Sequence, residues 1–204
     1  KMRVGADAEL DVARMKAMYE RLGPDIRIRA DANQAWSVKT AISLIRRFEP
    51  YGLESIEQPL KRWDIAGARE VTAAVNAPVM ADEGFWTADE AMLLMQNGAA
   101  NILHLYLSKC GGLYPALQIT KLAKAFDVDV TLGERVPLGI CEAADAHFAA
   151  ALPQLNYPCA IAYDLNEHDL LVRSLERSQG TLRVPEGPGL GIEVYEEKVA
   201  FYAV

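Results

Sequence analysis

Polar residues recur at a regular spacing along the sequence, each at the end of a short strand-like stretch. The first, Asp31, follows the alternating run at 26–30, in which every second residue is apolar. From one strand end to the next the steps are 26, 25, 24, 27 and 31 residues, through Asp31, Glu57, Asp82, Tyr106, Gly133 and Asp164. Such a step is about the length of one strand with its loop and helix. The chain is therefore expected to repeat a βα unit.

Helical periodicity fills the gaps between these strands. Ser37 and Thr87 are expected to be N-caps, because each comes directly before an apolar-periodic stretch. Strands are expected near residues 1–4, 26–30, 53–56, 78–81, 101–107, 128–132 and 160–162. Helices are expected over about 8–22, 38–48 and 64–75, and then up to about 97, 126 and 152.

Repetition of a right-handed βα unit predicts an α/β fold, a TIM-like (β/α) barrel. Only seven strands can be counted, so the first strand of a complete barrel is expected upstream of Lys1. We accordingly interpret the chain as a piece of a longer protein. An open doubly wound sheet is the alternative. It explains the alternation equally well, but it spreads the strand ends along a line instead of gathering them at one mouth.

Three of the strand ends carry acids on consecutive units, namely Asp31, Glu57 and Asp82. Three carboxylates at one barrel mouth cannot all stay charged unless a cation joins them. Hard oxygen ligands suit Mg²⁺, which also keeps coordination positions for water or substrate. Any one of these acids could instead be a helix N-cap or a surface-loop residue. Their matched positions favour a metal site.

The bulk composition excludes several classes of partner. With a formal net charge of −7, the protein is not expected to bind nucleic acid or an anionic membrane. No apolar run reaches the roughly 20 residues that span a bilayer. The three cysteines are odd in number and widely spaced, which is typical of free thiols in a reducing compartment and predicts a cytoplasmic protein. The apolar outer helices are compatible with a homo-oligomer.

Four motifs resemble the barrel of the enolase superfamily, in its mandelate racemase/muconate lactonizing enzyme branch. They are Asp31-Ala32-Asn33-Gln34, Glu57-Gln58-Pro59, Ala81-Asp82-Glu83 and Lys109-x-Gly111-Gly112, and the resemblance spans essentially the whole chain. It implies a modified, enolase-type barrel with Asp31, Glu57 and Asp82 as Mg²⁺ ligands. It also implies an N-terminal capping domain that is missing here. Residues 1–179 would be the incomplete catalytic barrel, and the Gly- and Pro-rich residues 180–204 an extended tail packing toward that cap.

The resemblance implies chemistry at the carbon next to a carboxylate. A hydrogen α to a carboxylate is very weakly acidic, and Mg²⁺ can absorb the charge of the enediolate that forms when it is removed. The base then selects the reaction. In the family, the second lysine of a Lys-x-Lys on the second strand is a base, and the sixth strand carries a lysine or an aspartate. Racemase-type members have a histidine base on the seventh strand, which aligns near Gly133 and is therefore missing here.

This chain departs from that pattern at both customary lysine positions. It has Lys1-Met2-Arg3 on the second strand and Tyr106 on the sixth. Arg3 stays protonated, so it is a poor base but a good electrostatic partner. We assign it to substrate binding or activation, with a salt bridge to a ligand carboxylate as the alternative. Lys1 shares its face of the strand by alternation. The resemblance implies that Lys1, as the first lysine of the motif, contacts the substrate carboxylate. Tyr106 is the candidate for proton transfer, with substrate binding or barrel filling as the alternative.

Other mouth residues are candidates for substrate contact, namely Asn33, Glu134 and Asp164. His104 lies two residues before Tyr106 and is interpreted as a core residue, with a proton relay to Tyr106 as the alternative. The sequence thus predicts an Mg²⁺-dependent enzyme acting on a small hydroxy-carboxylate, with dehydration of an acid sugar as its first expectation. Racemisation or epimerisation and cycloisomerisation come next. A metal- and carboxylate-binding protein that has lost turnover is the alternative from another class.

Overall fold

The computed structural model describes residues 1–133, 136–153, 155–159 and 165–203. Its internal contacts divide the chain into two compact units, Lys1–His104 with Gln118–Asp129 and Leu105–Leu117 with Val130–Val204. The strands are β1 (Met2–Arg3), β2 (Ile28–Asp31), β3 (Leu53–Glu57), β4 (Val79–Ala81), β5 (Ile102–Leu105), β6 (Asp129–Leu132), β7 (Arg177–Ser178) and β8 (Thr181–Leu182). The helices are α1 (Ala8–Leu22), α2 (Val38–Phe48), α3 (Ile65–Ala74), α4 (Ala88–Gln96), α5 (Leu107–Cys110), α6 (Leu113–Ala125), α7 (Gly139–Ala151) and α8 (Glu196–Tyr202), with a 3₁₀ turn η1 at Glu49–Tyr51.

Six strands form one sheet in the order β1-β2-β3-β4-β5-β6, which is their order in the sequence. From β1 to β5 each strand pairs with the next in parallel. An open doubly wound sheet reverses its strand order at a switch point. The described strands keep one order throughout, as successive staves of a barrel do, so the observed topology favours the predicted barrel over the open sheet.

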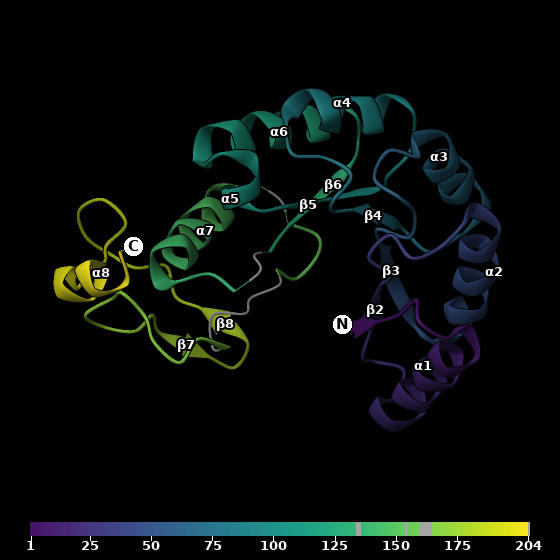
Figure 1. The fold of residues 1–204 in the computed structure, drawn as a ribbon, viewed down its shortest axis with the longest axis horizontal. Helices are drawn as coiled ribbons and strands as arrows, with labels where there is room; N and C mark the ends of the chain where they lie inside the picture. Colours follow the sequence, from purple (N-terminus) through teal and green to yellow (C-terminus); the bar gives the residue numbers. More distant parts are fainter. Residues whose placement is uncertain (134–135, 154, 160–164, 204) are drawn as a thin grey trace. The chain divides into compact units, whose positions relative to one another are not determined.

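In the first unit the helices α1, α2 and α3 lie along one side of strands β1 to β4 (Figure 1). Helix α2 illustrates why, because its buried residues Ala41, Leu44, Ile45 and Phe48 recur at helical spacing and face the sheet. They join a core that includes Met15, Ile28 and Ile56. With their apolar face covered by helices, the strands are free to present polar side chains at their carboxyl ends.

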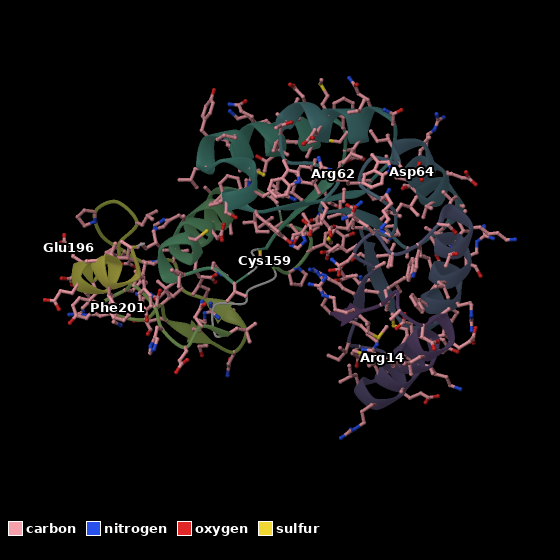
Figure 2. The ribbon with its side chains drawn as sticks, in the orientation of Figure 1. Arg14, Arg62, Asp64, Cys159, Glu196 and Phe201 are labelled. Carbon is pink, nitrogen blue, oxygen red and sulfur yellow. The ribbon has the colours of Figure 1, made fainter. Side chains whose placement is uncertain are left out.

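The local signals in this unit are confirmed closely. Helices α1 and α2 have the predicted bounds, and the Ser37 and Thr87 side chains accept hydrogen bonds from the backbone N–H groups of Thr40 and Glu90, at 3.3 Å each. Thr87 and Glu90 form a reciprocal capping box. Asp64, labelled in Figure 2, caps α3 by accepting from the Gly67 N–H at 2.9 Å.

The second unit departs from expectation just after β5. A strand was predicted up to Leu107, but β5 ends at Leu105 and the four-residue helix α5 begins at Leu107, with Tyr106 as its N-cap. Gly111 ends that helix in the left-handed region, at φ 88°, which favours glycine. The apolar run alone could not reveal this turn. The predicted strand at 160–162 lies outside the described residues.

Helix α7 is held within the second unit by polar contacts. Glu142 is paired with Arg177 at 3.0 Å, and the Gly139 N–H donates to Asp169 Oδ1 at 2.8 Å. The segment predicted as an extended tail is only partly so. It contains β8 of a small hairpin and ends in α8, where Phe201 is 80% exposed (Figure 2). The boundary at residue 179 and the packing of this segment toward a capping domain stay predictions.

The described residues bear on membrane-spanning helices and on the pairing of the three cysteines. Within them, none of the helices combines the length and the apolar character that crossing a membrane requires. Cys110, Cys141 and Cys159 are not joined by disulfides.

Candidate metal centre

Three acids lie at the carboxyl ends of three neighbouring strands. Asp31 ends β2 and Glu57 ends β3, and strand pairing places them side by side. Asp82 comes directly after β4. The three residues are 1%, 2% and 7% exposed. Buried carboxylates this close to one another repel when ionised, so each must be offset by positive charge, by hydrogen bonds or by a proton.

Part of that positive charge comes from two basic side chains, Lys1 directly before β1 and Arg3 within it. Lys1 Nζ lies 3.0 Å from Asp31 Oδ2 and 2.6 Å from Glu57 Oε2. Arg3 Nη1 lies 2.7 Å from Asp31 Oδ2 and also donates to Asn33 Oδ1. Lys1 and Arg3 therefore both meet the acids, as strand alternation predicts. The salt bridge of Arg3 to Asp31 corresponds to the alternative interpretation of that residue.

A second grouping joins acids and a histidine. Ligand atoms of Glu57, Asp82 and His104 all lie within 4.8 Å of one another. His104 comes from β5, is buried, and its Nδ1 is 3.4 Å from Glu57 Oε1. Of the predicted triad, the described structure thus gathers Glu57 and Asp82 with His104, while Asp31 faces Lys1 and Arg3. Two carboxylates and an imidazole at this spacing are a donor set that a divalent cation can use.

The surroundings of Asp31 and Glu57 shift the pKa values of these two carboxyl groups in opposite directions. Burial, reinforced by the nearby Glu57 charge, raises the pKa of Asp31 to about 6 from 3.8 despite the opposing effect of Lys1. Burial also acts to raise the pKa of Glu57, but its hydrogen bond and ion pair with His104, together with Lys1, outweigh this and lower it. Of these two acids, Asp31 is therefore the one whose ionisation is disfavoured.

Loop residues around the acids fix the strand ends. The Gln58 side chain accepts from the backbone N–H groups of Asp82 and Gly84, each at 3.0 Å, and so ties the end of β3 to the loop after β4. Asn33 donates from its backbone N–H to Asp31 Oδ1 at 3.0 Å, and from Nδ2 to Glu83 Oε1 at 3.3 Å. Asn33, predicted to bind substrate, therefore belongs to the frame around Asp31 in this structure.

Of the remaining predicted site residues, the structure describes Tyr106, which lies in the second unit. Tyr106 follows β5 directly, and Lys109 Nζ is 4.7 Å from the centre of its ring. That contact brings a positive charge to the face of the tyrosine. Glu134 and Asp164, predicted to contact substrate, lie outside the described residues.

Comparison with known proteins identifies the family of this chain. Residues 1–198 match the family model "Enolase C-terminal domain-like". The chain belongs to the enolase superfamily. It is 40% identical over 154 residues to a hydrophobic dipeptide epimerase of Enterococcus faecalis, an alignment covering 74% of this chain and 43% of that protein. It is 32% identical over 201 residues to muconate cycloisomerase 1 of Rhodococcus opacus, covering 98% of this chain and 54% of that one.

A solved structure also resembles this chain. The crystal structure of the dipeptide epimerase from Enterococcus faecalis in complex with Mg and the dipeptide L-Leu-L-Tyr superposes with a TM-score of 0.86 at 35% identity. It covers 93% of this chain and 54% of that protein. The chain thus spans about half the length of the curated relatives it matches. These matches confirm the barrel fold and the mandelate racemase/muconate lactonizing enzyme branch.

Enolase superfamily membership makes two features of this chain stand out. The first stays a prediction from the sequence, that Arg3 and Tyr106 take the positions of two lysines of the family. The second was predicted in part, since His104 is buried as expected of a core residue, but its Nδ1 also lies 3.4 Å from Glu57 Oε1. The sequence holds no local signal for this contact, because Glu57 ends β3 and His104 lies in β5, with β4 between them in the sheet.

Proposed function

We propose that the protein containing this chain is a Mg²⁺-dependent isomerase that removes the proton α to the carboxylate of a small substrate. The observation that carries the proposal is the set of buried acids on consecutive strand ends, in a chain whose relatives include dipeptide epimerases and muconate cycloisomerases. Acid-sugar dehydration, the first expectation from sequence, finds less support among those relatives than epimerisation or cycloisomerisation. A dipeptide or another N-acylated amino acid is the favoured substrate class.

In this proposal Asp31, Glu57 and Asp82 hold the metal. Their carboxylate oxygens suit Mg²⁺, and the raised pKa of Asp31 expresses the need for a cation at this point. When bound, Mg²⁺ supplies positive charge that offsets the charge gained by the substrate carboxylate as the α-proton leaves.

The basic residues of the chain would orient the substrate. Lys1 and Arg3 present their cationic groups at the same strand ends as the acids, so an incoming carboxylate meets positive charge there. Tyr106 would hold or move the α-proton at its phenol oxygen, since a phenol can serve as acid or base. The Lys109 ammonium over its ring favours negative charge on that side chain.

The test is proton exchange by the full-length protein. It is incubated with Mg²⁺ in D₂O, with one panel of dipeptides and another of acid sugars, and α-deuteration and products are followed by NMR. We expect deuterium at the α-carbon and an isomerised product from the dipeptide panel, with neither when EDTA is added. A 2-keto product from an acid sugar would restore dehydration instead.

A second candidate is a metal- and carboxylate-binding protein without turnover. It is favoured by the residues Arg3 and Tyr106, which stand where the resemblance implies lysine bases. The same experiment separates the two, because this candidate predicts substrate binding in the presence of Mg²⁺ with no deuterium incorporated in either panel.

A further inference from the structure

His104 is buried, but it lies beside two acids instead of among apolar side chains alone. It is 2% exposed, and it comes from β5, the strand that pairs with β4 through Met80–Ile102 and Ala81–Leu103. Asp82 follows β4 directly, and Glu57 ends the next strand in the sheet. Three successive strands therefore send one metal-binding side chain each into the same volume, with ligand atoms no more than 4.8 Å apart.

The nitrogen that faces this volume can be identified. Nδ1 of His104 lies 3.4 Å from Glu57 Oε1. Lys1 Nζ contacts both oxygens of Glu57, at 2.7 Å from Oε1 and 2.6 Å from Oε2. Glu57 Oε1 is thus contacted by both the Lys1 ammonium and the His104 imidazole. A divalent ion placed between Glu57 and Asp82 has the imidazole within its reach.

The type of donor decides which metal is favoured. Mg²⁺ prefers oxygen ligands, whereas an imidazole suits Zn²⁺, Fe²⁺ and Ni²⁺, and the affinity of a mixed nitrogen and oxygen site for divalent first-row ions rises from Mn²⁺ onward. Asp31 meanwhile is engaged by both Lys1 and Arg3, which weakens the purely carboxylate side of the site.

We propose that His104 is a further metal ligand at this centre, and that it gives the site a preference for first-row transition ions over Mg²⁺. The proposal rests on the proposed function, since it concerns the same metal. It differs in naming a nitrogen donor that the three-acid set does not contain. The bland alternative is that His104 only hydrogen-bonds to Glu57 and holds that side chain in place.

The test reads the ligand directly and does not depend on activity. The metal-free full-length protein is loaded with one equivalent of Mn²⁺, and coupling to an imidazole nitrogen is sought by pulsed EPR. His104→Asn removes the imidazole but leaves a hard oxygen near the position of Nδ1. His147→Asn is the matched control, because His147 lies in α7 and contacts the Leu190 carbonyl at 3.1 Å.

We expect nitrogen coupling in the unsubstituted protein and in His147→Asn, and its loss in His104→Asn. Calorimetry should show Mn²⁺ affinity falling on the order of 10- to 100-fold in His104→Asn, with Mg²⁺ affinity changed by less than about threefold. If His104→Asn does not fold, labelling the unsubstituted protein with ¹⁵N-histidine still decides the question. The ¹⁴N coupling should then be replaced by ¹⁵N lines.

The failures are distinguishable. Mn²⁺ bound without nitrogen coupling, or an unchanged Mn²⁺ to Mg²⁺ ratio in His104→Asn, overturns the role of His104 and leaves the proposed function standing. A protein that binds neither metal overturns both.

Discussion

The centre of the site and its flanks are built differently. Asp31, Glu57 and Asp82 are at most 7% exposed, and their positions are fixed by strand pairing and by loop hydrogen bonds. On the flanking strand β1, the Arg3 side chain is 68% exposed. We expect a change at a central acid to cost metal binding, whereas an exposed side chain can be exchanged at little cost to the fold. The difference predicts that the exposed flank at Arg3 tolerates substitution more readily than the buried acids do.

The largest expected effect comes from removing a central acid. Glu57→Gln should lower Mg²⁺-dependent α-proton exchange by roughly a thousandfold, because the charge that holds the metal is lost. Deuterium incorporation measured by NMR checks this. Glu54→Gln is the matched control, since Glu54 lies on the same strand but pairs with Arg29 at 2.6 Å. A Glu57→Gln protein within tenfold of the original would mean that the centre is no more essential than its flanks.

The next effect tests the flank after β5. Tyr106→Phe should reduce exchange by roughly a hundredfold or more, since it removes only the phenol oxygen that transfers the proton. Tyr114→Phe serves as control, because Tyr114 is exposed on α6. Full exchange by Tyr106→Phe would assign Tyr106 to barrel filling and leave the base to another residue.

A smaller effect is expected at Arg3. Arg3→Met should lower exchange by about tenfold, less than a buried donor would, because an exposed charge is screened by solvent. Arg3→Lys keeps the charge and should stay within about threefold of the original rate. Steady-state kinetics of both variants decides between charge and geometry, and an equal loss in the two would show that the guanidinium fork is what matters.

The smallest effect concerns stability without metal. Because the pKa of Asp31 is raised from 3.8 to about 6, its ionisation destabilises the fold above pH 6, and this penalty disappears as the pH falls toward 4. Asp31→Asn should therefore raise the free energy of unfolding at pH 7.5 in EDTA by on the order of 1 kcal/mol, after losing its ion pairs with Lys1 and Arg3.

Urea unfolding at pH 7.5 and pH 4 provides the measurement. The gain should vanish at pH 4, and saturating Mg²⁺ should reverse the order by stabilising only the unsubstituted protein. An Asp31→Asn protein that is less stable at pH 7.5 in EDTA would mean that Lys1 and Arg3 already satisfy Asp31.

The sequence was a good guide where one short-range rule decides the outcome. The spacing of Asp31, Glu57 and Asp82 follows from the length of a βα unit, so their places at adjacent strand ends were predictable. The Ser37 and Thr87 caps follow from side chains that satisfy orphan N–H groups.

It was a poorer guide where several structures share one pattern. The run at 102–107 is apolar enough for a continuous strand, so the turn that makes Tyr106 an N-cap was not visible. Helix α8 has only seven residues, too few for a clear period. The contact of His104 with Glu57 depends on which strands are neighbours and at what register, and this is fixed only once the sheet has formed.

Metal stoichiometry tests the central claim most directly. Equilibrium dialysis of the full-length protein against Mn²⁺, competed with Mg²⁺, should find one ion per chain, and none in the combined Asp31→Asn, Glu57→Gln and Asp82→Asn protein. One tightly bound ion retained by that triple variant, in a protein that still folds, would contradict a metal centre built from these strand ends.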